Sequence, residues 1–186
     1  MAGEIDDAIE RADREAFTRQ PPKTLKGQIG YLIRQLGSAK AVAQEIGVTA
    51  DSVNRYRRGA RKHARPDVAA KIEDAVRQRW QPQVRKRRQQ QAATTGGITV
   101  ETRARFGYTA PIGTTDDGRF RRLTVHLPPA YAQRLFDARN VGASDQQMRG
   151  IIAEGFKEIY FQDGGGRAMG LSDVAINDID YMDLDY

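Results

Sequence analysis

A short segment in the first half of the chain is rich in side chains that can contact nucleic acid. Arginine and lysine neutralise phosphates, and serine, asparagine and arginine can hydrogen-bond to the edges of bases. The residues of this set are Ser52, Asn54, Arg55, Arg57, Arg58, Arg61 and Lys62. A helix that exposes such side chains and ends in a basic cluster favours binding in the major groove of DNA.

The pattern around these residues predicts a helix-turn-helix over residues 39–58. Ala43 leaves room for two helices to pack closely, and Gly47 suits the turn because glycine tolerates a positive φ. Ser38 and Thr49 are predicted N-caps of the two helices. A purely structural three-helix bundle has the same spacing, so the DNA interpretation depends on the neighbouring basic residues.

A second basic run follows a predicted helix that begins near Pro66. It comprises Arg85, Lys86, Arg87 and Arg88. Such a run can simply be a solvated face, but next to a DNA-binding segment we expect it to contact the phosphate backbone. Contacts of that kind carry no sequence information.

A different chemistry is suggested by the segment 107–118, which connects two predicted strands. It carries the hydroxyls of Tyr108, Thr109, Thr114 and Thr115. Twelve residues is long for a hairpin connection, and long loops are often functional. The alternative is that Thr114 to Gly118 is only a turn, since Asp-Asp-Gly is typical turn chemistry.

Composition limits the classes of protein that remain. The 186 residues carry a net charge of +6 and include no cysteine, so disulfides and thiolate metal sites are excluded. Residues 1–90 hold 20 basic and 11 acidic side chains, whereas residues 91–186 hold 10 and 13. The first part therefore matches a polyphosphate partner. We expect no membrane segment and, because the first residues are acidic and polar, no secretory signal; the expected location is cytoplasmic.

The spacing of hydrophobic residues changes along the chain, from the period of a helix to the alternation typical of strands. We predict an α+β protein in which an N-terminal charged helix (residues 1–19) precedes a helical DNA-binding domain with a basic extension (20–91). A flexible boundary over residues 92–97 then leads to a small domain (98–186) with an antiparallel sheet and two or three helices. Ser144 and Gln147 are a predicted capping box in that domain.

The acidic strand predicted near residues 174–186 can be interpreted in two ways. Asp178 and Asp180, like Asp183 and Asp185, place carboxylates two residues apart, as polymerase-like metal sites do. We favour a solvated strand that faces basic residues, with Arg103, Arg105 and Arg121 as candidates. His63 and His126 have no metal-ligand spacing, so no metal site is predicted.

Several stretches together carry a likeness to a known family. They are PPKTLKGQIGYL (21–32), KAVAQEIGV (40–48), RWQPQVR (79–85), ATTGGITVETRARFGYTA (93–110), GTTDDGR (113–119), LPPAYAQRLFDA (127–138) and IYFQDGG (159–165). On these stretches the chain resembles the telomere-terminal proteins of actinobacterial, Streptomyces-type linear chromosomes and plasmids. Residues 49–58 differ from the family pattern, which leaves a telomere sequence preference open.

The resemblance implies a protein that is covalently linked to the 5′ ends of a linear replicon and primes the filling-in of those ends. The linkage implied for this chain is a phosphodiester at Thr114, with Thr115 as second choice. Asp116 and Asp117 would then touch a metal ion or shape the turn. The chain would be a nucleotide acceptor that binds no cofactor, rather than a turnover enzyme, because a partner DNA polymerase would supply the catalysis and the Mg²⁺.

The implied partners are telomeric DNA, a telomere-associated DNA-binding protein and the polymerase, with the protein held in the nucleoid at replicon ends. The acidic strand or the apolar face of residues 147–160 could dock a partner or a second copy of the chain. Two alternatives remain. One is a helix-turn-helix transcriptional regulator with a C-terminal dimerisation domain, and the other is a self-contained nucleotidyltransferase that uses the acidic strand.

Overall fold

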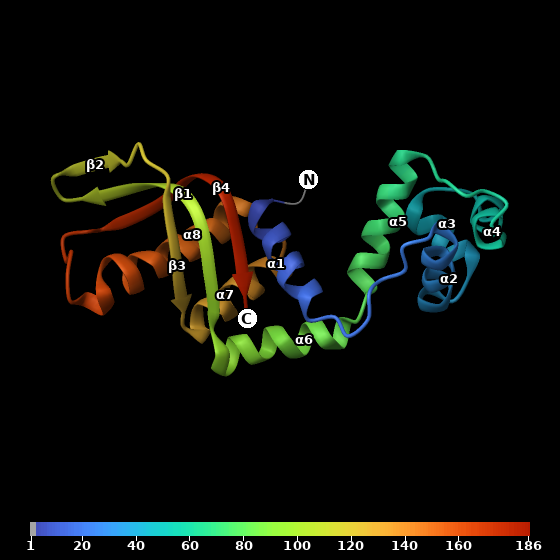
Figure 1. Cartoon of the computed structure of the whole chain (residues 1–186), viewed down its shortest axis with the longest axis horizontal. Helices are drawn as coiled ribbons and strands as arrows, with labels where there is room; N and C mark the ends of the chain where they lie inside the picture. The colour runs from blue at the N-terminus through green and yellow to red at the C-terminus, as the bar shows by residue number, and fades with distance from the viewer. Residues whose placement is uncertain (1–2) are drawn as a thin grey trace. The chain divides into compact units, whose positions relative to one another are not determined.

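The computed structural model describes residues 3–186, which divide into two compact units (Figure 1). Unit 1 holds residues 3–16 and 84–186, and unit 2 holds residues 17–83. The boundaries of the units differ from the expected domain boundaries, which lay between residues 19 and 20 and between residues 91 and 98. The first helix does not stand apart, because its apolar stripe is buried in the core of unit 1. The basic run after residue 84 likewise belongs with unit 1.

Unit 2 is helical. Its helices are α2 (Leu25–Leu36), α3 (Ala39–Ile46), α4 (Ala50–Arg58) and α5 (Pro66–Arg79). Thr24, Ser38 and Thr49 each accept a hydrogen bond at a helix N-terminus, which satisfies backbone donors that have no partner within the helix. Gly37 and Gly47 end α2 and α3 with positive φ values, the conformation that glycine adopts most easily.

The helices of unit 2 enclose one hydrophobic cluster. Fully buried members include Ile29, Leu32, Val42, Ile46, Val53 and Ile72. The apolar side chains of the four helices therefore share one core, and α5 packs against α2 and α3 to close the bundle. Because burial uses one face of each helix, the polar faces of α2 and α4 are left at the surface.

Unit 1 is built around an antiparallel sheet. Its strands are β1 (Ile98–Ala110), β2 (Gly113–Asp116), β3 (Arg121–Leu127) and β4 (Asp173–Asp185). Strand β1 is central: β3 pairs with its first part, β2 with its last part, and β4 runs along its other edge. Alternate residues of β1 from Ile98 to Phe106 are buried, so one face of this strand packs on the core.

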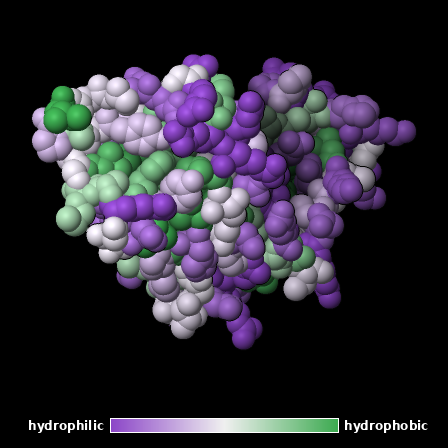
Figure 2. Space-filling view, turned by 60° about the vertical axis from the view of Figure 1, so that its left-hand side comes forward, coloured by the Kyte–Doolittle hydropathy of each residue, from purple (hydrophilic) through white to green (hydrophobic). Residues whose placement is uncertain are grey.

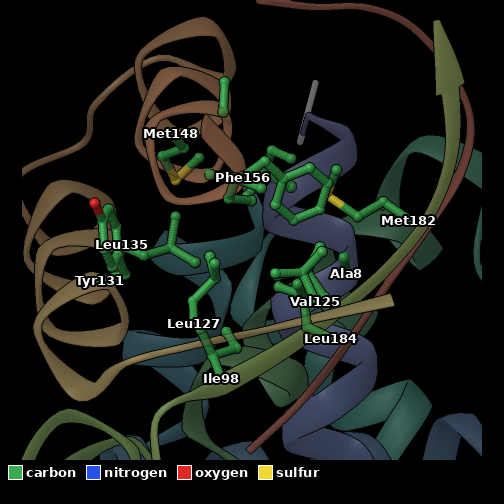
Figure 3. Close-up of a cluster of buried hydrophobic side chains, with 14 of the residues drawn as sticks. Ala8, Ile98, Val125, Leu127, Tyr131, Leu135, Met148, Phe156, Met182 and Leu184 are labelled. Carbon is green, nitrogen blue, oxygen red and sulfur yellow. The ribbon is translucent and has the colours of Figure 1, made fainter. Parts of the chain in front are cut away.

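Helices α1 (Glu4–Glu15), α7 (Pro129–Asn140) and α8 (Asp145–Gly155) pack with the sheet to form the core of unit 1, and α8 continues into a π-helical turn (Phe156–Phe161). The predicted capping box of Ser144 and Gln147 opens α8. In the core, side chains from the sheet, α1, α7 and α8 point toward one another, with Phe156, Leu127, Leu135 and Met182 among them (Figure 3).

The segment between the two halves of the chain is ordered, which corrects the expected flexible boundary at residues 92–97. Helix α6 (Pro82–Gln91) runs into a π-helical turn (Ala92–Gly96), and Ala92 is buried in the core of unit 1. The mixed α+β class with an antiparallel sheet is confirmed. Within the described residues, no helix has the length and apolar character needed to cross a membrane.

Candidate functional site

The segment expected to be a long loop is mostly a β-hairpin. Strand β1 continues to Ala110, the chain turns at Pro111 and Ile112, and β2 returns from Gly113. Gly113 has a φ of +139°, which a side chain would disfavour. The expectation of a flexible twelve-residue loop is therefore wrong. The alternation of β-prone side chains simply continues through Tyr108 and Thr109, and turn residues further on obscured it.

The two candidate hydroxyls lie on opposite faces of this hairpin. Thr114 pairs with Thr109 across the two strands, and Thr115 pairs with Tyr108. The Oγ1 atoms of Thr114 and Thr109 are 3.2 Å apart, a hydrogen bond in which either hydroxyl can donate. Every residue of β2 is exposed. The register thus separates the two threonines, which adjacency in sequence alone could not do.

Asp117 is engaged in shaping the return of the hairpin. Its carboxylate accepts hydrogen bonds from the backbone N–H of Arg119 at 3.1 Å and from Nε of Arg121 at 2.6 Å. The hydrogen bond from the Arg119 backbone, together with the one from Arg121, holds the pKa of Asp117 below its usual value. Its own N–H donates to the carbonyl of Phe106 at 2.8 Å. Of the two expected roles, shaping the turn is the one this geometry favours.

Asp116 faces a different set of neighbours. Its Oδ1 accepts from Nδ2 of Asn177 at 2.9 Å, which links β2 to β4. Gly107 lies opposite, and a Cβ at that position would stand 2.7 Å from the same Oδ1. The missing side chain of Gly107 therefore makes room for this link. Asn177 was not identified from the sequence, because only the strand pairing brings it near residue 116.

Two aspartates of β4 form ion pairs with arginines of β1. Arg103 pairs with Asp180, and Nη1 of Arg105 lies 3.3 Å from Asp178. This confirms two of the three basic partners expected for the strand; the third, Arg121, pairs with Asp117 instead. In residues 3–186 no group of three or more acidic or histidine side chains is placed to hold a metal ion.

Hydrophobic side chains are also exposed near the hairpin. In the space-filling view most of the visible face is hydrophilic, with hydrophobic side chains gathered toward its left side (Figure 2). Ile112 at the hairpin turn is fully exposed. The ring of Phe120, which follows the hairpin, lies 5.0 Å and 4.7 Å from the guanidinium carbons of Arg103 and Arg105.

The candidate DNA-contacting residues of α4 and of the segment after it differ in whether their polar groups already have partners within the protein. Ser52 belongs to the helix cap, with its N–H and its hydroxyl both bonded to Thr49 Oγ1. Arg55 is paired with Asp51 at 2.8 Å, and Asn54 is half-buried. In contrast, four cations are exposed and have no ion-pair partner within the described chain. These are Arg57, Arg58, Arg61 and Lys62.

The helical period places the basic residues of α6 on different faces of the helix. Arg85 points inward and forms hydrogen bonds of 2.8 and 3.1 Å to the two carboxylate oxygens of Glu10. Arg88 is partly covered, with its guanidinium over the ring of Tyr186. Lys86 and Arg87 remain exposed. The expectation of a phosphate contact therefore fails for Arg85, whose side chain is only 11% exposed, and remains open for the two exposed cations.

Around Arg85 lies a buried ionic cluster that the sequence did not reveal. Glu10 also accepts from Arg139 at 2.6 Å, and Asp13 is fully buried. Burial raises the pKa of Glu10, but hydrogen bonds from Arg85 and Arg139 outweigh it and leave the value below normal. Burial raises the pKa of Asp13 above normal, since the hydrogen bond from Tyr186 offsets it only in part. The cluster joins α1, α6 and α7 within unit 1.

The chain matches no family model, no curated protein and no solved structure. The likeness to telomere-terminal proteins therefore stays an expectation from the quoted sequence stretches.

Proposed function

We propose that this chain is a protein primer for the ends of a linear replicon, and that Thr114 accepts the first deoxynucleotide. The observation that carries this proposal is the position of Thr114. Its hydroxyl is exposed on the short strand of a hairpin, where another protein's active site could enclose it. The sequence likeness to telomere-terminal proteins supplies the chemistry.

In the proposed step Thr114 Oγ1 attacks the α-phosphorus of a deoxynucleoside triphosphate. A bond forms between Oγ1 and phosphorus, the bond to the bridging oxygen breaks, and pyrophosphate leaves with that electron pair. A threonine hydroxyl is a weak nucleophile at neutral pH, so its proton must pass to a base of the polymerase. Since Asp116 and Asp117 are bonded to Asn177 and arginines, the Mg²⁺ is assigned to the polymerase.

Unit 2 is proposed to bind duplex DNA as a helix-turn-helix, with α4 as the helix in the major groove. Its support is the set of exposed, unpaired cations that begins at Arg57 and continues beyond the end of α4. Each cation that neutralises a phosphate releases bound counterions, which favours binding. The proposed location is the nucleoid, at replicon ends, with a second telomere-binding protein as a further partner.

Unit 2 taken alone also fits a transcriptional regulator in which unit 1 serves dimerisation. That alternative requires no covalent nucleotide and a palindromic operator. The two proposals therefore differ in the chemical state of the hairpin.

Mass analysis of the hairpin peptide tests the proposal. Trypsin releases residues 106–119, which include both candidate threonines and no internal cleavage site. We expect this peptide, taken from replicon-bound protein after nuclease treatment, to carry a nucleotide remnant at Thr114. An unmodified peptide would exclude the priming role, and a remnant at Thr115 would reassign the residue.

A further inference from the structure

A surface groove in unit 2 combines aromatic rings with basic side chains. It has a volume of about 730 Å³ and lies between α2, the segment that precedes it, and the end of α5. Its lining includes Tyr31 and Trp80, with Lys26, Arg34 and Arg57 around them. The groove belongs to unit 2 and the hairpin to unit 1. Of the groove residues named here, only Arg57 belongs to the candidate DNA-contacting set.

The two rings of the groove are fixed in place by their polar atoms. Their centroids are 4.8 Å apart, with the planes inclined at 59°. Trp80 Nε1 donates to the carbonyl of Arg19 at 2.9 Å, and the Tyr31 hydroxyl donates to the carbonyl of Arg79. Because these polar atoms are already satisfied, the accessible part of Trp80 is an apolar ring. A held aromatic ring is a stacking surface for a nucleobase.

The floor of the groove includes two glycines, of which Gly27 is covered by Thr24 and Pro22 and Gly30 is open. Gly27 and Gly30 are three residues apart on α2, so they lie on one face of the helix. A Cβ at Gly30 would meet nothing closer than Nη1 of Arg34 at 3.8 Å. The guanidinium of Arg34 therefore lies beside open space above the helix backbone. This open space and the ring of Trp80 line the same groove.

The charge of the groove is uncompensated. Lys26, Arg34 and Arg57 have no ion-pair partner within residues 3–186, and no acidic residue lines the groove. Elsewhere in unit 2, Arg55 and Arg79 are neutralised by Asp51 and Glu45. Three unpaired cations around one groove attract a ligand with repeated negative charge.

We propose that this groove binds a single-stranded segment of nucleic acid. One base stacks against Trp80 over the glycine floor, and the phosphates on either side contact Arg34, Lys26 and Arg57. A base in a duplex has both faces covered by its neighbours, so only an unpaired base can use the ring. An acidic peptide would use the cations but leave the ring and the floor without a role. The proposal does not depend on a covalent link at Thr114.

Fluorescence tests this proposal directly, because Trp80 is the only tryptophan of the chain. The full-length protein is titrated with an oligothymidylate of about eight nucleotides. We expect saturable quenching that weakens as salt is added. Gly30→Leu, which fills the floor, and Arg34→Gln should each weaken binding by roughly 10-fold or more. Lys40→Gln removes an exposed cation of the same unit outside the groove and should leave the affinity within about 2-fold of the parent value.

Three results would overturn the proposal. The first is no quenching by the oligothymidylate, and the second is unchanged affinity in a Gly30→Leu variant whose circular dichroism shows an intact fold. The third is equal quenching by polyglutamate, which would assign the groove to an acidic peptide. A Thr114→Val variant should bind the oligothymidylate normally, so a failure of the priming proposal and a failure of this one remain distinguishable.

Discussion

The hydroxyls of Thr109 and Thr114 form a cross-strand pair, with 3.2 Å between their Oγ1 atoms. The proposed nucleophile is therefore held by a register of four residue pairs between β1 and β2, rather than carried on a flexible loop. A fixed position lowers the entropy lost when the hydroxyl enters another protein's active site. The same pair also distinguishes Thr114 from Thr115, which lies on the opposite face.

Substitution of the two threonines should separate them clearly. Thr114→Val removes the hydroxyl and keeps a β-branched side chain, so the hairpin should persist while attachment of a labelled deoxynucleotide by the partner polymerase is lost. Thr114→Ser should retain attachment, because serine supplies an equivalent hydroxyl. Thr115→Val is the matched control and should remain active. Activity in Thr114→Val would show that another group accepts the nucleotide.

Thr109 is expected to be a positioning residue. Thr109→Val removes one exposed, neutral hydrogen bond, which is worth about 0.5–1.5 kcal/mol. If that bond orients Thr114, the rate of nucleotide attachment should fall by about 2- to 10-fold, with the KM for the nucleotide unchanged. A loss as complete as that of Thr114→Val would instead indicate that Thr109 takes part in the chemistry.

Asp117 should stabilise the hairpin in a pH-dependent way. Its pKa in the folded protein is depressed by the Arg119 backbone N–H and by Arg121, so its stabilising effect is present above its unfolded pKa. The effect is lost as the pH falls through the lower folded value. We therefore expect Asp117→Asn to melt at a lower temperature than the parent at pH 7, and this difference to shrink in strong acid. A difference independent of pH would show that ionisation of Asp117 is not the cause.

The salt dependence of duplex binding tests the role of α4. Arg58 is exposed at the end of the helix and has no ion-pair partner in the described chain, so it is available to a phosphate. Arg58→Gln should weaken binding to all duplex sequences and lower the slope of log affinity against log salt by about one. Arg55→Gln provides a comparison, since Arg55 is already paired with Asp51. Equal slopes for Arg58→Gln and the parent would exclude a phosphate contact.

Local patterns in the sequence predicted much of the fold. The caps at Ser38 and Thr49 and the capping box at Ser144 each depend on neighbours within one helical turn, which the sequence displays directly. The pairing of Arg103 and Arg105 with β4 also followed from alternation on two strands.

The features that were missed depend on contacts between distant residues. Arg85 was taken for a surface cation because its partner, Glu10, is 75 residues away in the chain. The role of Asp116 depends on Asn177, 61 residues away, and on the gap at Gly107. No local pattern indicates that the ring of Trp80 lines a groove, because the groove forms only where α2, the segment before it and the end of α5 meet. A sequence pattern shows which face of a helix or strand is apolar, but it does not show which other element packs against that face.

The buried cluster of unit 1 should lose unequal amounts of stability on two similar substitutions. Glu10 is held ionised by Arg85 and Arg139, so Glu10→Gln removes the carboxylate that both guanidinium groups share. Asp6 and Asp13 still compensate part of that charge, so the substitution should cost about 2 kcal/mol of unfolding free energy at pH 7. Asp13 has a raised pKa, and an asparagine there can still accept from the Tyr186 hydroxyl, so Asp13→Asn should cost about 1 kcal/mol or less.

The pH profiles of these two variants should also have opposite signs. The stabilisation from Glu10 is fully present above its unfolded pKa and is lost as the pH falls through its lower folded value, so the cost of Glu10→Gln shrinks in acid. The unfavourable ionisation of Asp13 is absent below its unfolded pKa and grows as the pH rises through its higher folded value. Asp13→Asn should therefore gain stability relative to the parent between about pH 4 and pH 7. Urea denaturation at both pH values measures this, and equal costs for the two variants at pH 7 would contradict the assignment of a favourable charge to Glu10 and an unfavourable one to Asp13.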